Sequence, residues 1–423
     1  MKLLVIAGNY PHAEHVSGTF SERCACVLNS LSQGVEVIVP RPYVPSFLTS
    51  VHPRWKSYKK IPCLQSRKGI TIHRPACVHP PCFGSAFWHS TGAYWGCRRK
   101  AIQLHRRQPF HAIMSFDIYS AGGVAWRLGK TLGLPVCGWA FGSDVRVPKG
   151  YFARQIVKKT LTNLDLVFYQ SYELLQKAGE ILEVTPEEMM GDRHIVLPHG
   201  IPLPPLLDIN KVRNQVRSSL GISDSDILIL NVGRIVREKG PFELLEALLV
   251  ARRGNSKIKG VIVGSQFGYD ETSVVQKTID DNPLLQNSVA LVPACEPTDI
   301  WNYLCAADIF AFPSHNEGMP NALLEAMIMG VPAVAFGIPP VHEINREGDA
   351  LLMVPKLDVD KFGQAILSLA NDPEARKRIG QCGQEAVQGR FLMQENMKKA
   401  LTYVEGLLPK TQVAVTANQF AIN

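Results

Sequence analysis

The sequence predicts an α/β protein with two doubly wound parallel sheets, and three observations support this. Short apolar runs alternate with longer stretches in which apolar residues recur at helical spacing. A Pro-rich stretch at residues 199–205 separates two such series and reads as a linker. The 423 residues exceed what one hydrophobic core accommodates, and 46% of them are apolar, which suffices for two cores.

The first half of the chain opens with an apolar strand at residues 3–7. This run is too short for a signal peptide and is broken at once by Gly-Asn-Tyr-Pro. Residues 19–32 have the spacing of a crossover helix, which joins neighbouring parallel strands. Further strands are expected at residues 35–39, 112–115, 136–139, 166–169 and 194–197. This order predicts the first parallel sheet.

The second half repeats the pattern after the linker. A helix is expected at residues 211–220 and another at residues 394–408. The strands between them are expected at residues 227–232, 260–264, 290–293, 309–312 and 333–336. The polar residues that follow, 409–423, have the composition of a flexible tail.

Two carboxylates flank an expected helix start after the strand at residues 309–312. Glu317 lies in the preceding loop, Pro320 suits a first helical turn, and Glu325 lies on the helix, which should run to about Met329. The unpaired backbone N–H groups of that helix start favour a phosphate or a sugar oxygen. Carboxylates accept hydrogen bonds from vicinal hydroxyls, so one Glu suits a sugar and the other a ribose. The alternative is a solvated helix start whose acidic residues complement its dipole.

A second segment has the residues of a phosphate clamp. The strand at residues 227–232 runs into Gly233 and Arg234, and Lys239 precedes the next helical pattern. Glycine lets the backbone approach a ligand, and the two cations can neutralise a diphosphate as Mg²⁺ does elsewhere. A surface turn with solvated cations is the alternative, but the position at a strand end favours a ligand site.

These segments resemble the retaining glycosyltransferases of group 1, or family 4, over nearly the whole chain. The matching residues are Pro313-Ser314, Glu317, Glu325, Gly330-Val331-Pro332 and Glu343. The resemblance implies the GT-B fold, in which two Rossmann-like doubly wound domains face a central cleft. It implies an acceptor-side domain at residues 1–205, a nucleotide-sugar-binding domain at 206–390 and a helix at 391–408 packing back on the first domain.

The resemblance also assigns roles to residues. The catalytic group comprises Arg234, Lys239 and Glu317, with the two cations stabilising the leaving diphosphate. The donor-binding group comprises Gly18, Gly233, Gly318, Met319, Pro320, Asn321 and Glu325, and the acceptor side comprises Asp144 and His199. No metal or cofactor is expected. The Asp224-Ser-Asp226 string precedes a strand instead of ending one, which is unlike a metal-binding carboxylate pair.

The acceptor side departs from the family pattern. Phe141 stands where members usually carry His or Arg before Gly-Ser-Asp, and His199-Gly200 replaces Asn-Gly. A phenyl ring can neither relay a proton nor bind an oxyanion. Retention in the family is commonly explained by same-face attack, in which the leaving diphosphate helps take the acceptor proton. The protein must then supply positioning and leaving-group stabilisation, so these departures leave an enzyme possible.

The positive charge is concentrated in one region. Residues 37–116 contain 13 Lys and Arg and no Asp or Glu, although the net charge of the whole chain is only +8. Interleaved aromatic residues suit an anionic membrane face or a lipid-linked acceptor. Nucleic acid is not expected, because no recognition motif accompanies the charge, and an unengaged basic surface is the plain alternative. No run approaches the ~20 apolar residues that span a bilayer, so contact would be peripheral, on the inner face of the membrane of a cytoplasmic protein.

The sequence therefore predicts a retaining, metal-independent glycosyltransferase. It would move a sugar from a nucleoside diphosphate sugar to a hydroxyl of a lipid-linked or polysaccharide acceptor, in cell-envelope or exopolysaccharide synthesis. A GT-B nucleotide-sugar epimerase and a nucleotide-sugar-binding scaffold without turnover are the alternatives. The 10 cysteines lack zinc-site spacing and are expected to be reduced thiols.

Overall fold

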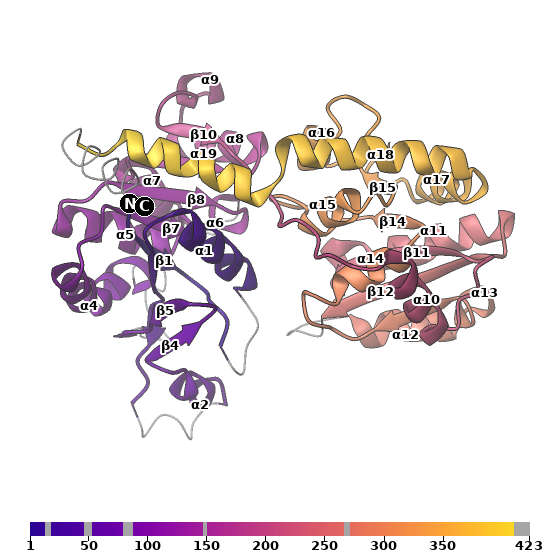
Figure 1. Ribbon diagram of the computed structural model, residues 1–423, viewed down its shortest axis with the longest axis horizontal. Coiled ribbons are helices and arrows are strands. Elements are labelled where there is room, and N and C mark those ends of the chain that lie inside the picture. The colour runs from indigo at the N-terminus through magenta and orange to yellow at the C-terminus, as the bar shows by residue number, and fades with distance from the viewer. Residues whose placement is uncertain (13–17, 46–52, 79–87, 147–149, 266–270, 410–423) are drawn as a thin grey trace. The chain divides into compact units, whose positions relative to one another are not determined.

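The computed structural model describes residues 1–12, 18–45, 53–78, 88–146, 150–265 and 271–409. The chain forms two units (Figure 1), Met1–His199 with the residues from Met393 on, and Gly200–Leu392. The first boundary thus lies after the first residue of the Pro-rich stretch, and the second unit ends two residues beyond position 390. The expected tail falls, except for its first residue, outside the described residues.

The first unit contains an eight-stranded sheet in the order β10-β9-β8-β7-β1-β2-β5-β4, in which only the β4–β5 pair is antiparallel. Its strands are β1 Leu3–Ala7, β2 Val35–Ile38, β4 Leu64–Arg67, β5 Ile70–His73, β7 Ala112–Phe116, β8 Val136–Ala140, β9 Leu166–Tyr169 and β10 His194–Val196. A separate short pair joins β3 Arg41–Pro42 to β6 Ala76–Cys77. All six predicted strands of this half are confirmed to within one residue at each end.

The hairpin of β4 and β5 was not predicted from the sequence. Lys68 and Gly69 connect its strands with φ angles of 50° and 75°, as a two-residue turn between twisted strands requires. Lys68 and Arg67 both pair with Glu22 of α1 (Thr19–Leu31). The hairpin is therefore tied to the first crossover helix by charge as well as by the sheet.

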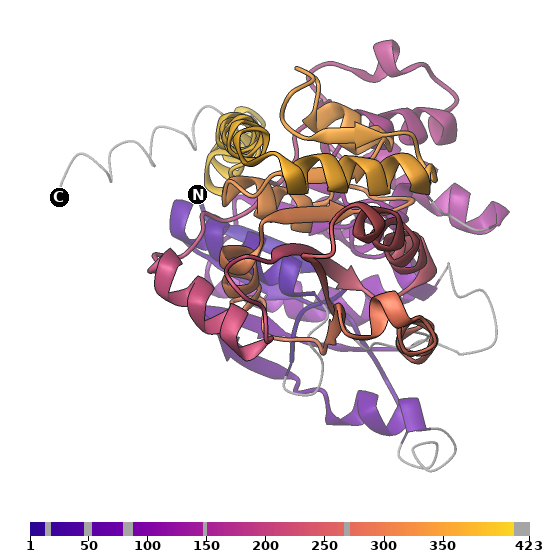
Figure 2. The same cartoon turned by 90° about the vertical axis from the view of Figure 1, so that its right-hand side faces the viewer.

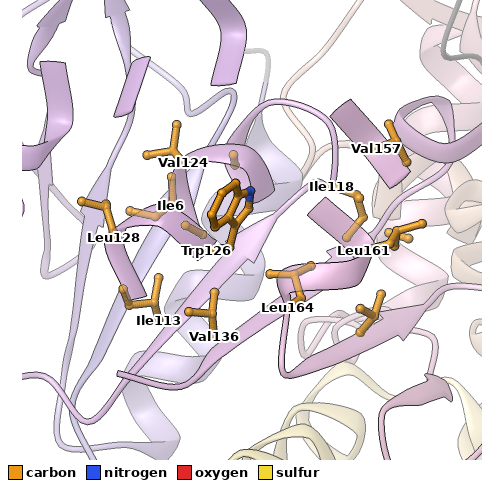
Figure 3. Close-up of a cluster of buried hydrophobic side chains, with 14 of the residues drawn as sticks. Ile6, Ile113, Ile118, Val124, Trp126, Leu128, Val136, Val157, Leu161 and Leu164 are labelled. Atoms are coloured by element: carbon orange, nitrogen blue, oxygen red, sulfur yellow. The ribbon is translucent and has the colours of Figure 1, made fainter. Parts of the chain in front are cut away.

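Helices cover both faces of this sheet. One face packs Ile6, Ile113 and Val136 around Trp126 (Figure 3) and against helices α4 (Ala93–Arg107), α5 (Ala121–Leu132), α7 (Tyr151–Asn163) and α8 (Tyr172–Leu182). The other face packs against α1 and α19 (Met393–Gly406), which contribute side chains to one cluster. The remaining helices of the unit are α2 Pro53–Lys60, the π-helix Trp88–Gly92, α4 Ala93–Arg107, α5 Ala121–Leu132, α6 Ser143–Arg146, α7 Tyr151–Asn163, α8 Tyr172–Leu182 and α9 Pro186–Met189.

The second unit is a six-stranded parallel sheet in the order β13-β12-β11-β14-β15-β16, with helices on both faces (Figures 1 and 2). Its strands are β11 Ile227–Arg234, β12 Ile258–Ser265, β13 Val289–Val292, β14 Ile309–Phe312, β15 Ala333–Phe336 and β16 Leu352–Val354. Its helices are α10 Ile209–Ser219, the 3₁₀ turn Arg237–Lys239, α11 Pro241–Gly254, α12 Thr272–Asp280, α13 Pro283–Gln286, α14 Ile300–Ala306, α15 Asn321–Ile328, α16 Pro339–Ile344, α17 Val359–Asn371 and α18 Pro373–Arg390. The five predicted strands are confirmed, and β16 is added.

Each sheet changes its direction of winding once. In the first unit the change lies between β1 and β7, and in the second it lies between β11 and β14. Loops that leave the carboxyl ends of such strands diverge to opposite faces and open a crevice in which ligands bind. These two positions are where functional side chains are to be sought.

The described residues also bear on membrane-spanning helices and on the state of the cysteines. None of their helices is both long enough and apolar enough to cross a bilayer. The nine cysteines among them are free thiols.

Candidate active site

The loops that follow β11 and β14 lie at the winding change of the second sheet. These loops contact each other closely at Gly240, which has a φ of 70° and on which a Cβ atom would overlap the carbonyl oxygen of Pro313. The backbone N–H of His315 and the Oγ of Ser314 both donate to the carbonyl oxygen of Glu238, at 2.8 and 3.2 Å. The two loops therefore form one rigid edge of the site.

Lys239 and Glu317 meet at this edge. The ammonium group of Lys239 forms an ion pair with Oε1 of Glu317, and the Oγ of Ser314 donates to the same oxygen at 3.0 Å. Both charged side chains remain partly exposed, at 22% and 16%. A diphosphate that reaches Lys239 must therefore share this cation with Glu317, so the carboxylate fixes where the ammonium group points.

Gly233 and Arg234 end β11 beside this pair. A Cβ atom on Gly233 would meet nothing within 4 Å, so the space next to its backbone is open. Arg234 is exposed and, unlike Lys239, forms no ion pair with another described residue. The neighbouring strand β12 also has a glycine one residue before its end, Gly264, where a side chain would overlap Ile235. An anion can thus approach the backbone at Gly233, next to the cationic side chain of Arg234.

Helix α15 begins in the same loop. Pro320 is its N-cap and supplies no side-chain cap, so the first-turn N–H groups lack an intrahelical partner. Among the described residues, none donates a hydrogen bond to the buried Oδ1 of Asn321. Met319 and Glu325 are 8% and 7% exposed, and Gly318 is partly exposed. The helix start thus offers an anion-binding end with a polar side chain beside it.

Three predicted site residues, Gly18 of the donor-binding group and Asp144 and His199 of the acceptor side, fall in the first unit and make local structural contacts. Gly18 has a φ of 88° at the start of α1, and a Cβ atom there would lie 2.6 Å from the backbone nitrogen of Tyr10. A side chain at position 18 would therefore collide with the backbone of Tyr10, which explains the glycine without any ligand. His199 is 3% exposed, and its ring lies 3.9 Å from that of Phe20 and 6.0 Å from that of Phe141.

Asp144 joins two strand ends in the first unit. Its carboxylate accepts hydrogen bonds from the backbone N–H groups of Gly142 at 2.7 Å and Ile118 at 2.8 Å, and from that of Phe141. Burial raises the pKa of Asp144 above its usual value. With these amides occupying its oxygens, Asp144 positions the loops after β7 and β8.

Comparison with known proteins identifies the family. The sequence profile described as "Glycosyl transferases group 1" matches residues 212–386, which contain both loops and α15. The putative teichuronic acid biosynthesis glycosyltransferase TuaC of Bacillus subtilis is 27% identical over 98% of this chain and 100% of its own length. Residues 212–386 belong to the group 1 glycosyltransferase family. The capsular polysaccharide biosynthesis glycosyltransferase CapM of Staphylococcus aureus is also 27% identical, over 44% of this chain and 47% of its own.

Solved structures confirm the GT-B fold of this glycosyltransferase. HepE of Anabaena, solved in complex with UDP and glucose, matches with a TM-score of 0.70 and 16% identity over 96% of this chain and 100% of its own. A glycosyltransferase of Rickettsia africae matches with a TM-score of 0.72 and 15% identity over 96% and 98%. These structures confirm the expected α/β fold with two doubly wound sheets.

Two features of the glycosyltransferase were missed in the sequence. Nε2 of His315 lies 3.0 Å from Oε1 of Glu243 on α11, one residue beyond the Ser314 contact. Asp117 follows β7 directly, in the way that Arg234 closes β11. A polar residue directly after an apolar run signals a possible site residue at a strand end. This signal was used after β11 and β14 but was not applied after β7.

Proposed function

We propose that the protein transfers a sugar, with retention and without a metal ion, from a nucleoside diphosphate sugar to a hydroxyl of a lipid-linked or polysaccharide acceptor. The observation that carries the proposal is the ion pair of Lys239 and Glu317 where the loops after β11 and β14 meet, close in the chain to the start of α15, which has no side-chain cap. Cationic side chains and free N–H groups at one edge suit a diphosphate, and a carboxylate next to them suits sugar hydroxyls.

The residues have distinct tasks in this proposal. Arg234 and Lys239 bind the diphosphate and stabilise the negative charge that develops as it leaves. Glu317 orients Lys239 and contacts the donor sugar, while Glu325 holds the ribose hydroxyls. Gly233, Gly318 and the helix start at residues 319–321 allow the backbone to approach the ligand. Arginine and lysine supply the charge neutralisation for which other enzymes use Mg²⁺, and no cofactor takes part.

The names of similar proteins support the class of donor and product. HepE has been solved with UDP, with UDP and glucose, and with UDP-glucose. TuaC and CapM are named for teichuronic acid and capsular polysaccharide synthesis. We therefore infer a role in assembling a cell-envelope polysaccharide from nucleotide sugars.

A melting-temperature screen against UDP-, GDP- and ADP-sugars, with and without EDTA, tests the proposal. One donor is expected to stabilise the protein in both conditions, by about 2.7 kcal/mol at a concentration 100-fold above its Kd. Glu325→Ala should lose that stabilisation, whereas Glu246→Ala, on an exposed position of α11, should keep it. Stabilisation that disappears with EDTA would contradict metal independence, and stabilisation by none of the sugars would contradict the donor class.

The same preparations distinguish the alternative functions. An epimerase would convert a nucleotide sugar in the absence of any acceptor, which product analysis detects. A scaffold would bind a donor without turnover, an alternative motivated by Phe141, whose ring packs on Phe20 at 4.6 Å instead of offering a polar group.

We further propose that helix α4 contacts an anionic membrane. Trp95 is 65% exposed near its start, and Arg98, Arg99 and Arg106 are exposed along the helix. Trp95, Arg98, Arg99 and Ile102 recur at spacings of three and four residues and share one side of the helix, which has no acidic residue. An aromatic ring with cations on one face is typical of helices that lie at a lipid surface.

Binding to phosphatidylglycerol vesicles should depend on these cations. Arg98→Gln with Arg99→Gln is expected to weaken vesicle binding by about 2 kcal/mol, because each basic residue near an anionic surface contributes about 1 kcal/mol. Lys377→Gln with Arg378→Gln, an exposed pair on α18, should leave it unchanged. Co-sedimentation measures both, and equal loss in the two double variants would show general charge attraction in place of a dedicated face.

A further inference from the structure

Two thiols meet in the first unit, where the short strand β6 contacts helix α4. Cys77 ends β6, and Cys97 lies at the start of the second turn of α4. Their Sγ atoms are 4.0 Å apart. Cys97 has no exposed surface and Cys77 is 4% exposed, so the two sulfur atoms touch inside the unit. This thiol pair, Cys77 and Cys97, shares no residue with the proposed donor site.

The backbones of β6 and α4 also approach each other closely. A Cβ atom on Gly96 would lie 3.0 Å from Cα of Cys77 and would overlap its Sγ. The same Sγ lies 3.5 Å from the carbonyl oxygen of Ala93, in the first turn of the helix. A disulfide requires such an approach, because it spans Cα atoms only about 4.4–6.8 Å apart. The strand and the helix are therefore placed for a bond between their side chains.

The two sulfur atoms differ in how readily they lose a proton. A hydrogen bond from the Cys97 thiol lowers the pKa of Cys77 against the opposing effect of burial, and the backbone N–H and positive charge of Arg41 act in the same direction as that bond. The same hydrogen bond, together with burial, raises the pKa of Cys97. Because the thiolate is the nucleophilic form of cysteine, Cys77 is the sulfur that attacks first.

The strand that carries Cys77 lies at the surface, although the thiol pair faces inward. Ala76 and Val78, the two neighbours of Cys77, are both exposed. β6 pairs with β3 in a two-stranded sheet, apart from the eight-stranded sheet of the unit. A segment held by so few ladder hydrogen bonds opens locally at low cost. A small displacement of β6 therefore admits a small oxidant and lets the two sulfur atoms approach.

Other cysteines of the first unit lack this combination. Burial raises the pKa of both Cys24 and Cys137, which makes them poor nucleophiles. Cys63 is exposed, and its Sγ lies 3.2 Å from a guanidinium nitrogen of Arg41. The thiol pair differs from all three, because it joins the more acidic sulfur to a second thiol in contact with it.

We propose that Cys77 and Cys97 form a reversible disulfide when the protein meets hydrogen peroxide. The thiolate of Cys77 attacks one peroxide oxygen, the O–O bond breaks, and a sulfenic acid and hydroxide form. The sulfur of Cys97 then attacks the oxidised sulfur, whose S–O bond breaks, and the oxygen leaves as water with the proton of the Cys97 thiol. Overall, two thiols and one peroxide molecule give one disulfide and two water molecules. A dithiol reductant reverses the bond by thiol–disulfide exchange.

The bond would close a loop of 19 residues, 78–96, between β6 and α4. Such a cross-link restricts the unfolded chain and stabilises the segments that it joins. It would hold the start of α4, which carries the exposed Trp95, against the strand. Amide hydrogen exchange in the first turns of α4 should therefore slow in the oxidised protein and return to its original rate on reduction.

Peptide mapping of the full-length protein under non-reducing conditions, after treatment with hydrogen peroxide, tests the proposal. The peptides that contain Cys77 and Cys97 should be recovered linked, two hydrogen atoms lighter than their sum, and should separate after dithiothreitol. Oxidation of the exposed Cys63 shows that the peroxide treatment worked. An unlinked pair in that sample would overturn the proposal. A bond from Cys77 to Cys63, or to Cys82, which lies outside the described residues, would overturn it as well.

Single variants test the order of the two steps. Cys97→Ser keeps a hydroxyl that can donate to Cys77 but cannot form the bond, so a sulfenic acid should accumulate at Cys77 and react with dimedone. Cys77→Ser should give no such adduct at the buried Cys97. Cys63→Ser, the matched control, should form the disulfide at the wild-type rate. A dimedone adduct at Cys97 alone, or loss of the disulfide in Cys63→Ser, would contradict direct attack by Cys77.

Discussion

Replacing Lys239 with Met is expected to lower kcat for sugar transfer by about 10²- to 10³-fold, the usual effect of removing one charge-stabilising donor from an active site. Met keeps an unbranched side chain that is one atom shorter and removes the ammonium group that pairs with Glu317. The carboxylate would then stand next to the diphosphate without its cation. Repulsion between these negative charges should also weaken donor binding.

Steady-state kinetics with the donor found in the melting screen measures this effect. Lys257→Met serves as the matched control, because Lys257 is exposed and precedes β12 at the opposite edge of the sheet. Adding Glu317→Gln to the Lys239 variant should restore part of the donor affinity but not kcat. A Lys239→Met enzyme with wild-type kcat would contradict the assignment of the clamp.

Arg217→Met is expected to destabilise the second unit by about 3–5 kcal/mol, because it removes one partner of a buried ion pair. Arg217 is 1% exposed, and its guanidinium donates to Asp308 at 3.0 Å and to the carbonyl oxygens of Ser223, Asp226 and Ala306. The change removes one hydrogen bond from each of these three carbonyl groups and from the carboxylate, although the carbonyl oxygens of Ala306 and Ser223 keep a bond from Arg213 and from the backbone N–H of Asp226. These groups connect α10 and the loop before β11 to β14.

Hydrogen exchange of peptides from β11 and β14 measures the loss within this unit alone. Arg213→Met is the matched comparison, because Arg213 pairs with the same Asp308 but is 29% exposed, and its loss should cost less than half as much. Equal protection in the wild type and Arg217→Met would show that the pair contributes no net stability.

Much of the fold was predictable because strand signals in parallel sheets are local. Residues 309–312 and 333–336 are apolar runs bounded by Pro or Gly, and the structure has strands with those bounds. The hairpin at residues 64–73 was missed because it lies at a sheet edge, where β4 has no buried residue and β5 is only four residues long. Neither strand therefore forms a long apolar run. Its turn, Lys68-Gly69, was the one local signal.

The candidate site was predictable in its residues but not in its contacts. Lys239 and Glu317 are 78 positions apart, and the sequence assigns each a ligand without indicating that they pair with each other. The roles of Asp144 and Gly18 as loop connectors depend on backbone groups that no sequence pattern reveals. The φ angle of 115° at Asp117 likewise has no signature in residue type.

The return of the chain to its first unit has a consequence for synthesis on the ribosome. Helix α19 follows the second unit in sequence but packs Met397, Ala400 and Val404 with Leu3 and Leu28 of the first unit (Figure 1). The first unit therefore cannot complete its core while translation is in progress, although its sheet is made early. Its apolar face stays open to chaperones and to other nascent chains until the second unit has been synthesised. A message that stops before codon 393 would encode an intact second unit beside a permanently uncovered first one.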